Sequence, residues 1–394
     1  MTSHTPEVGK PDSVVVSPRA AVIGPIAANI AFVIEITLVP LLLPAIQLQF
    51  GLSIGELAWV FNSYGIAVAV GVLLGGWCGD AFNTKKVFGY GVAVFAIGSF
   101  LVAAADSFGT LIIGRTMQGF GGGIFSPLVP LLLTRASPQK PGKVLIVWGS
   151  IAGYVAAFAP LLYGSFLGAH GWNLAFILTA TVALIALMIL NGSQITDDLA
   201  PRPGSTTGYS ELFRTRDLWV TFVYVFCTYG SITYYLFQLP VWMSDNEVNW
   251  ASTGFALSIL WLTFSALSAL LRNMVDRPDI RPIMFSAPLL IAAGLWLSYY
   301  SEILLLLVVS SVLVGSGLAC SNAPSTQLIL RFAPKGMSAI STSLDITFAR
   351  LGGIATVAFL VETDFVYAAL AIGLLCIVAV FCALKASKGL ADSI

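Results

Sequence analysis

The chain has 394 residues, of which 57% are hydrophobic and only 10% are charged. A soluble domain carries about 25% charged residues, so this composition excludes a soluble globular protein and predicts an integral membrane protein. The formal net charge is zero, which gives no sign of a nucleic-acid partner. Histidine occurs only at His4 and His170, and the five cysteines have no metal-ligand spacing, so no metal site is expected.

Residues 1–19 are polar and contain three prolines, and we expect them to form a cytoplasmic tail without a cleavable signal peptide. A membrane-spanning helix needs about 20 apolar residues. Twelve segments of the chain have this character: 20–46, 56–78, 86–106, 108–133, 143–168, 172–192, 218–243, 251–271, 282–300, 302–330, 339–361 and 365–385. The predicted fold class is therefore an all-α integral membrane protein with twelve transmembrane helices.

Lysine and arginine residues gather on one side of this predicted topology. With a cytoplasmic N-terminus, every loop on the cytoplasmic side and both tails contain basic residues, whereas the outer loops contain none. Cytoplasmic loops of membrane proteins carry an excess of Lys and Arg, so both termini are expected in the cytoplasm. Only Arg115 and Arg350 lie inside predicted spans away from the ends of those spans.

A polar stretch rich in Pro, Gly, Ser and Thr divides six predicted helices from six and reads as a flexible linker. The loops after the second and eighth spans are similar, because Asp80 and Lys85 align with Asp276 and Arg281 at an offset of 196 residues. Convergent turn chemistry explains this similarity as well as duplication does, but the equal division favours two pseudo-symmetric halves. The expected parts are tail, bundle, linker, bundle and tail, at 1–19, 20–192, 193–217, 218–385 and 386–394.

Several short stretches carry motifs in a fixed order along the chain. They are IEITLVPLLLPAI (34–46), GGWCGDAFNTKKVF (75–88), LIIGRTMQGFGGG (111–123), WGSIAGYVAAFAPLLYG (148–164) and FARLGG (348–353). Together they resemble the major facilitator superfamily, and specifically its drug:proton antiporter branch. The matching residues are Glu35, Thr37, Pro44, Trp59, Tyr64, Gly76, Asp80, Lys85, Lys86, Arg115, Gln118, Gly119, Pro160 and Gly164.

The chain departs from the family pattern at several positions. Glu35 stands where Asp is usual, Pro40 where Asn is usual, and Ala159 where glycine is usual. In the loop after the second span, basic residues are replaced at Ala81 and Thr84, and Asn83 replaces a glycine whose left-handed turn it can adopt.

Four charged residues lie within the predicted spans away from their ends and are candidates for proton coupling: Glu35, Arg115, Asp345 and Arg350. Counted along straight helices, Glu35 and Arg115 lie about 3 Å and 8 Å from their span midpoints on the same side, so they are expected to pair if their helices adjoin, as the resemblance implies. Asp345 and Arg350 are about 140° apart around one helix and do not share a face. These groups either fix helix packing or carry protons, since burial and a neighbouring arginine have opposite effects on a carboxylate.

We expect Asp80 to hold an inner gate closed, because the resemblance places it near the positive N-terminal end of the eleventh helix. The other expected gating residues are Lys85, Pro160, Gly164 and Asp276, and Gly149 and Gly153 are expected to allow close helix approach. Asp80 as a solvent-facing acid, and the glycines as ordinary packing residues, are the alternatives.

The resemblance implies a substrate cavity lined by helices 1, 4, 7 and 10. Polar and aromatic side chains in and near these helices are the candidates for substrate binding: Asn62, Tyr64, Gln118, Tyr229, Tyr234, Gln238, Asn322 and Gln327. The tyrosines of the seventh span are explained equally by packing and an interfacial aromatic belt.

From these features we expect a proton-coupled secondary transporter of a bacterial inner membrane that exports a small amphipathic compound as a monomer, with the proton gradient in place of a cofactor. Uptake of a small organic solute on the same fold is the alternative. An intramembrane enzyme or a receptor is disfavoured, because the sequence shows no nucleotide-binding loop, Ser-His-Asp set or sizeable soluble domain.

Overall fold

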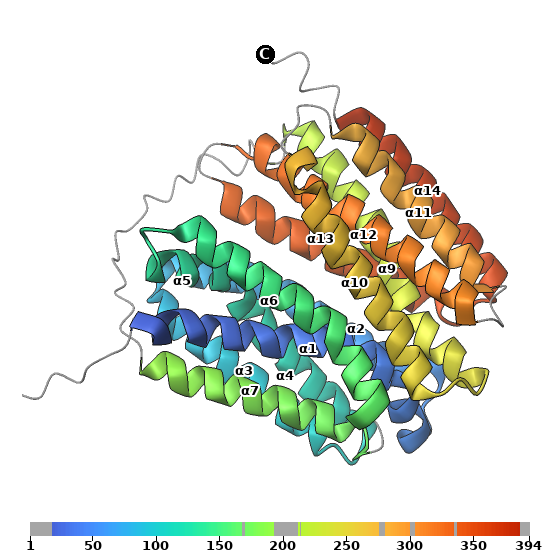
Figure 1. Ribbon diagram of the computed structural model, residues 1–394, viewed down its shortest axis with the longest axis horizontal. Coiled ribbons are helices and arrows are strands. Elements are labelled where there is room, and N and C mark those ends of the chain that lie inside the picture. The colour runs from blue at the N-terminus through green and yellow to red at the C-terminus, as the bar shows by residue number, and fades with distance from the viewer. Residues whose placement is uncertain are drawn as a thin grey trace, which may run out of the picture.

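The computed structural model describes residues 18–167, 170–192, 212, 214–275, 280–299, 304–334 and 337–386. Over these residues the fold is all-helical (Figure 1), and twelve spans are long and apolar enough to cross a membrane. They begin and end within a few residues of the predicted segments, so the twelve-helix prediction is confirmed. Most of the predicted tails and linker, and the Asp276 loop, lie outside the described residues.

Six spans form each half of the molecule. The N-terminal half contains α1 (Pro18–Phe50), α2 (Ile54–Ala81), α3 (Thr84–Ala103), α4 (Phe108–Phe125) continued by η1 (Ser126–Leu128) and α5 (Val129–Ala136), α6 (Pro141–Leu162) continued by the π-helix η2 (Tyr163–Leu167), and α7 (Asn173–Asn191). The C-terminal half contains α9 (Arg216–Asp245), α10 (Trp250–Val275), α11 (Arg281–Tyr299), α12 (Leu304–Phe332), α13 (Ser338–Leu360) and α14 (Phe365–Ala386).

The two halves share a core at only one end of the bundle. We call the end where α1 begins and α14 ends the terminal end, and the opposite end the distal end. At the distal end one continuous cluster of buried apolar side chains joins both halves, including Leu42, Val60, Phe237 and Leu257. At the terminal end the buried side chains fall into separate clusters, one within each half. The ribbons correspondingly diverge toward the terminal end (Figure 1).

Two pairs of helices hold the halves together along their sides. Helices α2 and α13 run antiparallel, since Asn62 Nδ2 donates to the Ile354 carbonyl at 3.3 Å, and a Cβ at Gly76 would lie 3.3 Å from Ser343 Oγ. On the other side, α6 and η2 pack against α10. These contacts join the two halves along both sides of the bundle.

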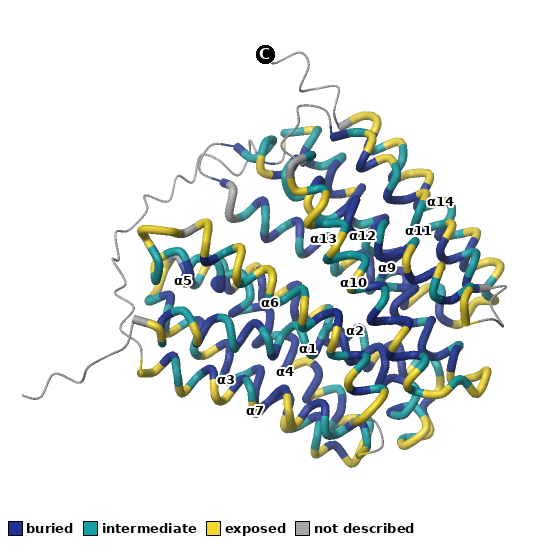
Figure 2. The backbone as a smooth tube through the Cα atoms, in the orientation of Figure 1, coloured by how far each residue is buried: buried dark blue, intermediate teal, exposed yellow. Residues whose placement is uncertain are grey.

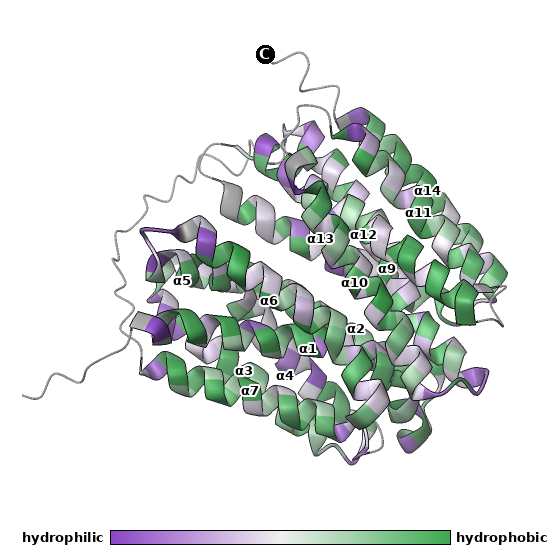
Figure 3. Ribbon diagram, in the orientation of Figure 1, coloured by the Kyte–Doolittle hydropathy of each residue, from purple (hydrophilic) through white to green (hydrophobic). Residues whose placement is uncertain are grey.

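The outer surface of the bundle is apolar, as expected for a protein in contact with lipid. Exposed and half-buried segments face outward on the helices (Figure 2), and hydrophobic residues dominate these same surfaces (Figure 3). On α14, Leu370, Leu374, Ile377 and Phe381 recur at helical spacing and are each more than half exposed. In water such a stripe would be unfavourable, whereas in a bilayer it meets hydrocarbon.

Glycines in α4 allow it to lie between α2 and α3 at backbone contact distance. The Gly119 position faces the Tyr64 carbonyl of α2, and a Cβ at Gly123 would lie 2.5 Å from the Val68 carbonyl. On the opposite face of α4, a Cβ at Gly114 would lie 2.8 Å from the backbone of Val102 in α3. Small residues permit this approach in membranes, and they bring Arg115 into the interior of the N-terminal half.

Two local predictions are wrong. Asn83 does not form a left-handed turn: its φ is −59° and its side chain accepts a hydrogen bond from the Lys86 amide as the N-cap of α3. An asparagine can satisfy a free helical N–H in a way that glycine cannot. Gly149 makes no close helix approach, because a Cβ there would meet nothing within 4 Å.

The close packing of α4 on α2 gives a test of the fold. Gly119→Ala places a methyl group against the Tyr64 carbonyl and should lower the unfolding temperature of the purified protein, since overpacking a core costs about 1–3 kcal/mol. Gly149→Ala is the matched control, because that position is open and alanine favours a helix. Thermal unfolding in detergent measures both; equal stability of the two variants would contradict the close contact.

Candidate functional site

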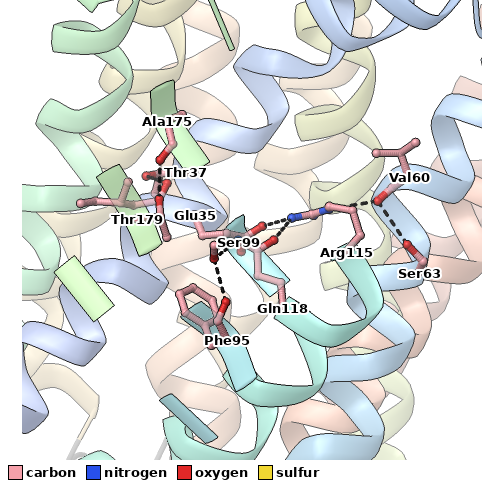
Figure 4. A network of polar contacts seen from close by, with 11 residues as sticks. Glu35, Thr37, Val60, Ser63, Phe95, Ser99, Arg115, Gln118, Ala175 and Thr179 are labelled. Carbon is pink, nitrogen blue, oxygen red and sulfur yellow. Dashed lines mark hydrogen bonds and ion pairs between the residues drawn. The ribbon is translucent and has the colours of Figure 1, made fainter. Parts of the chain in front are cut away.

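A buried ion pair joins α1 and α4 near the middle of the N-terminal half (Figure 4). The Arg115 Nη1 lies 2.5 Å from Glu35 Oε1, and both side chains are 1% exposed. Glu35 lies close to the middle of its span, Arg19–Phe50. The predicted pairing of Glu35 with Arg115 is thereby confirmed, and their charges compensate each other at membrane depth.

Arg115 also has partners other than Glu35. Its Nε donates to the Val60 carbonyl of α2 at 3.2 Å, and its Nη1 donates to Gln118 Oε1 at 2.6 Å. Gln118 Nε2 in turn donates to Ser99 Oγ of α3 at 2.9 Å. Three helices therefore fix the guanidinium (Figure 4). Gln118, predicted to bind substrate, is fully buried with both its amide atoms occupied in this network.

Aromatic rings complete the surroundings of the Arg115 guanidinium. Its central carbon lies 4.4 Å from the centroid of the Tyr64 ring and 5.9 Å from that of Phe176. A cation over an aromatic face is stabilised by the ring quadrupole, and more so when both are shielded from water. Tyr64 of α2 therefore interacts with Arg115 through its ring, which leaves its hydroxyl group free to point elsewhere.

Three buried polar atoms near this pair lack a hydrogen-bond partner among the described residues: Glu35 Oε2, Tyr64 Oη and Asn62 Oδ1. A buried polar atom without a partner costs about 1–3 kcal/mol. Groups of this kind commonly mark functional positions. Asn62 and Tyr64, both predicted to bind substrate, lie on α2 where it packs against α13.

A second polar group occupies the C-terminal half. Asp345 of α13 is 6% exposed, and its Oδ2 accepts a hydrogen bond from Thr326 Oγ1 of α12 at 2.8 Å. The Tyr229 hydroxyl of α9 donates to Asn322 Oδ1 of α12 at 2.7 Å. Tyr229 and Asn322, both predicted to bind substrate, are thus brought together, and both are half-buried.

The remaining predicted substrate residues do not form one surface. Tyr234 is buried in the core that the two halves share. Gln238 lines a cavity of about 10 Å³ between α9, α11 and α14, which is large enough only for a water molecule. Gln327 is half-buried on α12. Two other tyrosines of α9 serve packing, because Tyr224 donates to the Met284 carbonyl and Tyr235 bonds Ser310.

Two of the predicted gating residues lie where α6 and η2 meet α10. A Cβ at Gly164 would lie 2.6 Å from the Trp250 carbonyl, and the Pro160 carbonyl contacts Gly254. Lys85 lies in the first turn of α3. Asp80 belongs to α2, but its side chain and the whole of Asp276 lie outside the described part of the chain, so their gating roles stay predictions.

Ser99 and Thr326 are the partners that sequence reasoning missed. Each hydroxyl holds a predicted charged or polar residue, Ser99 through Gln118 and Thr326 through Asp345. Single hydroxyls are common in membrane helices, where they also bond their own backbone, as Ser99 does to Phe95. Only the positions of neighbouring helices distinguish a hydroxyl that binds another helix.

The buried pair can be tested by its effect on stability. Arg115→Met leaves the Glu35 carboxylate without its counter-charge, and breaking a buried pair in this way costs about 3–5 kcal/mol. The double variant Glu35→Gln/Arg115→Met should recover part of the loss. Arg272→Met, at an exposed position near the end of α10, is the control. Thermal unfolding of the wild type, Glu35→Gln, Arg115→Met and the double variant in detergent gives the coupling, and additive effects would contradict it.

Curated relatives match the chain over part of its length. The multidrug resistance protein B homologue of Mycobacterium tuberculosis (strain CDC 1551 / Oshkosh) is 33% identical over 165 residues, which are 42% of this chain and 31% of the relative. The puromycin resistance protein pur8 of Streptomyces alboniger is 32% identical over 165 residues, 41% of this chain and 33% of the relative. The matches thus span about a third of the length of these relatives.

Solved structures share the fold over nearly the whole chain. A D-xylose-proton symporter superposes with a TM-score of 0.74 at 16% identity, over 94% of this chain and 96% of the symporter. An auto-inhibited peptide transporter of the POT family gives a TM-score of 0.72 at 15% identity, covering 96% and 97%. The family model for the Major Facilitator Superfamily matches residues 26–357. With twelve spans in two halves and a family model that matches most of its length, the chain belongs to the Major Facilitator Superfamily.

Proposed function

We propose that the chain is a proton-coupled secondary transporter that exports a small amphipathic organic compound by alternating access. The observation that carries this proposal is the ion pair of Glu35 and Arg115, which is buried within the N-terminal half at membrane depth. The similarity to relatives named for multidrug and puromycin resistance supports export of such compounds.

The contacts of Arg115 support a role for Glu35 in binding the proton. Protonation of Glu35 removes its negative charge, but Arg115 keeps its bonds to the Val60 carbonyl and to Gln118, and its contact with the Tyr64 ring. An arginine stays charged at any physiological pH. The site can therefore lose the ion pair without leaving an unsolvated cation, so two states of Glu35 are both tolerable.

The asymmetry of the core supports alternating access. If the terminal end faces the cytoplasm, as the distribution of basic residues favours, the shared apolar cluster closes the outer side. On the inner side each half has its own buried cluster, and α2 and α13 stay in contact along one side. This corresponds to an inward-facing state, in which a cytoplasmic compound could enter between the halves. In this proposal Asp80, near the end of α2, acts in closing the inner side.

Import is the second candidate, and the shared fold with a D-xylose-proton symporter is compatible with it. Membership of a transporter family disfavours an enzyme or a receptor. In the proposal the proton gradient is the energy source, and no cofactor is needed. The partners are the small-molecule substrate and the lipid bilayer. The protein acts as a monomer in a bacterial inner membrane. Flux measured in both directions distinguishes export from import.

Glu35→Gln should abolish proton movement that depends on substrate, because glutamine keeps the size of the side chain but cannot release a proton. Inverted membrane vesicles containing a fluorescent pH indicator, challenged with a panel of amphipathic compounds, measure this movement. Glu56→Gln is the control: Glu56 caps α2 at the exposed distal end, and glutamine can fill the same capping position.

Proton flux in the Glu35→Gln variant equal to that of the wild type would remove Glu35 from the mechanism. The pair would then serve helix packing, and the stability cycle of Glu35 and Arg115 would still detect it. Gel filtration of the variant in detergent confirms that folded protein is compared with folded protein.

A further inference from the structure

Arg350 lies in the middle of a membrane-spanning helix, where a charged side chain is unfavourable. It is the central residue of the span Ile340–Leu360 in α13, and it is half-buried. An arginine at the centre of a membrane helix costs roughly 2.5–3.5 kcal/mol even on the lowest scales. Arg115 offsets such a cost by pairing with Glu35. Arg350, which is also at membrane depth, likewise requires a compensating partner.

No described residue forms an ion pair or a hydrogen bond with the Arg350 guanidinium. The two buried acids at membrane depth are engaged elsewhere, Glu35 with Arg115 and Asp345 with Thr326. Asp345 is on the same helix, but five residues place it about 140° around the axis. Among the described residues, the Arg350 guanidinium therefore has no acceptor in direct contact with it.

The position of Arg350 is at the seam between the two halves. Ile354, one helical turn further along α13, accepts a hydrogen bond from Asn62 of α2, so this face of α13 meets the N-terminal half. Gly352, close by on α13, packs instead against the Phe226 carbonyl of α9. The glycines of FARLGG thus pack α13 against its own half, and Arg350 lies at the seam between the two halves.

The charge of Arg350 acts on one hydroxyl group from each half. Tyr64 of α2 packs in one apolar cluster with Ile346, which lies one helical turn before Arg350 on α13. The charge of Arg350 acts on the Tyr64 hydroxyl and on the Tyr229 hydroxyl of α9, and the Glu35 and Asp345 carboxylates, respectively, act on the same two hydroxyls. Tyr229 already donates to Asn322, whereas Tyr64 Oη has no hydrogen-bond partner among the described residues. The Arg350 guanidinium therefore lies at membrane depth, between the halves, near a hydroxyl group that has the Glu35 carboxylate as its neighbour but makes no hydrogen bond within the described residues.

We infer that Arg350 and Tyr64 bind a carboxylate, or a similar anionic group, of the amphipathic substrate. A carboxylate accepts two parallel hydrogen bonds from a guanidinium, and its remaining lone pairs can accept from the Tyr64 hydroxyl. The inference rests on the proposed transport function and narrows its substrate class to organic anions. It assigns Arg350 to substrate binding and leaves proton binding to Glu35.

The test measures the binding of matched aromatic compounds to the purified protein in detergent. Naphthoate, biphenyl carboxylate and indole carboxylate are each compared with the corresponding primary amide and aminomethyl cation, and binding is followed by thermal shift. At least one carboxylate should bind the wild type about tenfold or more tightly than its amide, the usual worth of a charged hydrogen bond.

Arg350→Gln should remove this preference while amide binding stays unchanged. Arg350→Lys should retain part of it, because lysine keeps the charge but loses the planar fork. Tyr64→Phe should weaken carboxylate binding several-fold and leave the ring beneath Arg115. Arg272→Gln, which removes a cation from an exposed position on α10, is the control and should retain the full preference.

Three results would overturn the inference. These are a wild type that binds no carboxylate more tightly than its amide, a preference that survives Arg350→Gln, and an equal loss of carboxylate, amide and cation binding in that variant. Flux measurements distinguish this inference from the proposed function. Proton-coupled transport of amides or cations, but not of carboxylates, would support the transport function and refute the anion site. Carboxylate binding that needs Arg350, without any proton-coupled flux, would support the anion site and refute the transport function.

Discussion

The structure depends on the pairing of Glu35 with Arg115, because two charges at the depth of a bilayer must be compensated within the protein. The pair requires α1 and α4 to adjoin, and Arg115 also requires α2 for the Val60 carbonyl and for the Tyr64 ring. The glycines of α4 permit that approach by removing the side chains that would hold the helices apart. One electrostatic requirement thereby accounts for the arrangement of three helices in the N-terminal half.

The C-terminal half meets the same problem differently. Asp345 is held by a neutral hydroxyl group and Arg350 has no anion beside it. Each half thus has one acid and one arginine at membrane depth, but only the N-terminal half pairs them directly. A twofold-related scaffold can in this way present two unlike surfaces to a ligand that lies between them, one with its charges paired and one with its charges apart.

The sequence was sufficient to predict the fold, because a span of apolar residues in a membrane has few alternatives to a helix. The Glu35–Arg115 pair was also predictable, since helical rise gives depth and the family resemblance gives adjacency. The residues that line a cavity were not predictable in this way. The position of a residue in a span gives its depth in the membrane, but not the neighbouring helix toward which its side chain points. Gln118 and Gln238 illustrate this: each occupies a helix that the resemblance assigns to the cavity, yet both point into the interior of their own half.

The apolar cluster that joins the halves at the distal end has a consequence for an idle protein. Most of its members, such as Leu42 and Phe237, are hydrocarbon, and the hydroxyl groups of Tyr163 and Tyr235 are hydrogen-bonded within their own half. Separating the two halves would expose that hydrocarbon to water at a cost of about 25 cal/mol per Å². Without a ligand to offset this cost, the idle protein keeps the seal between its halves closed.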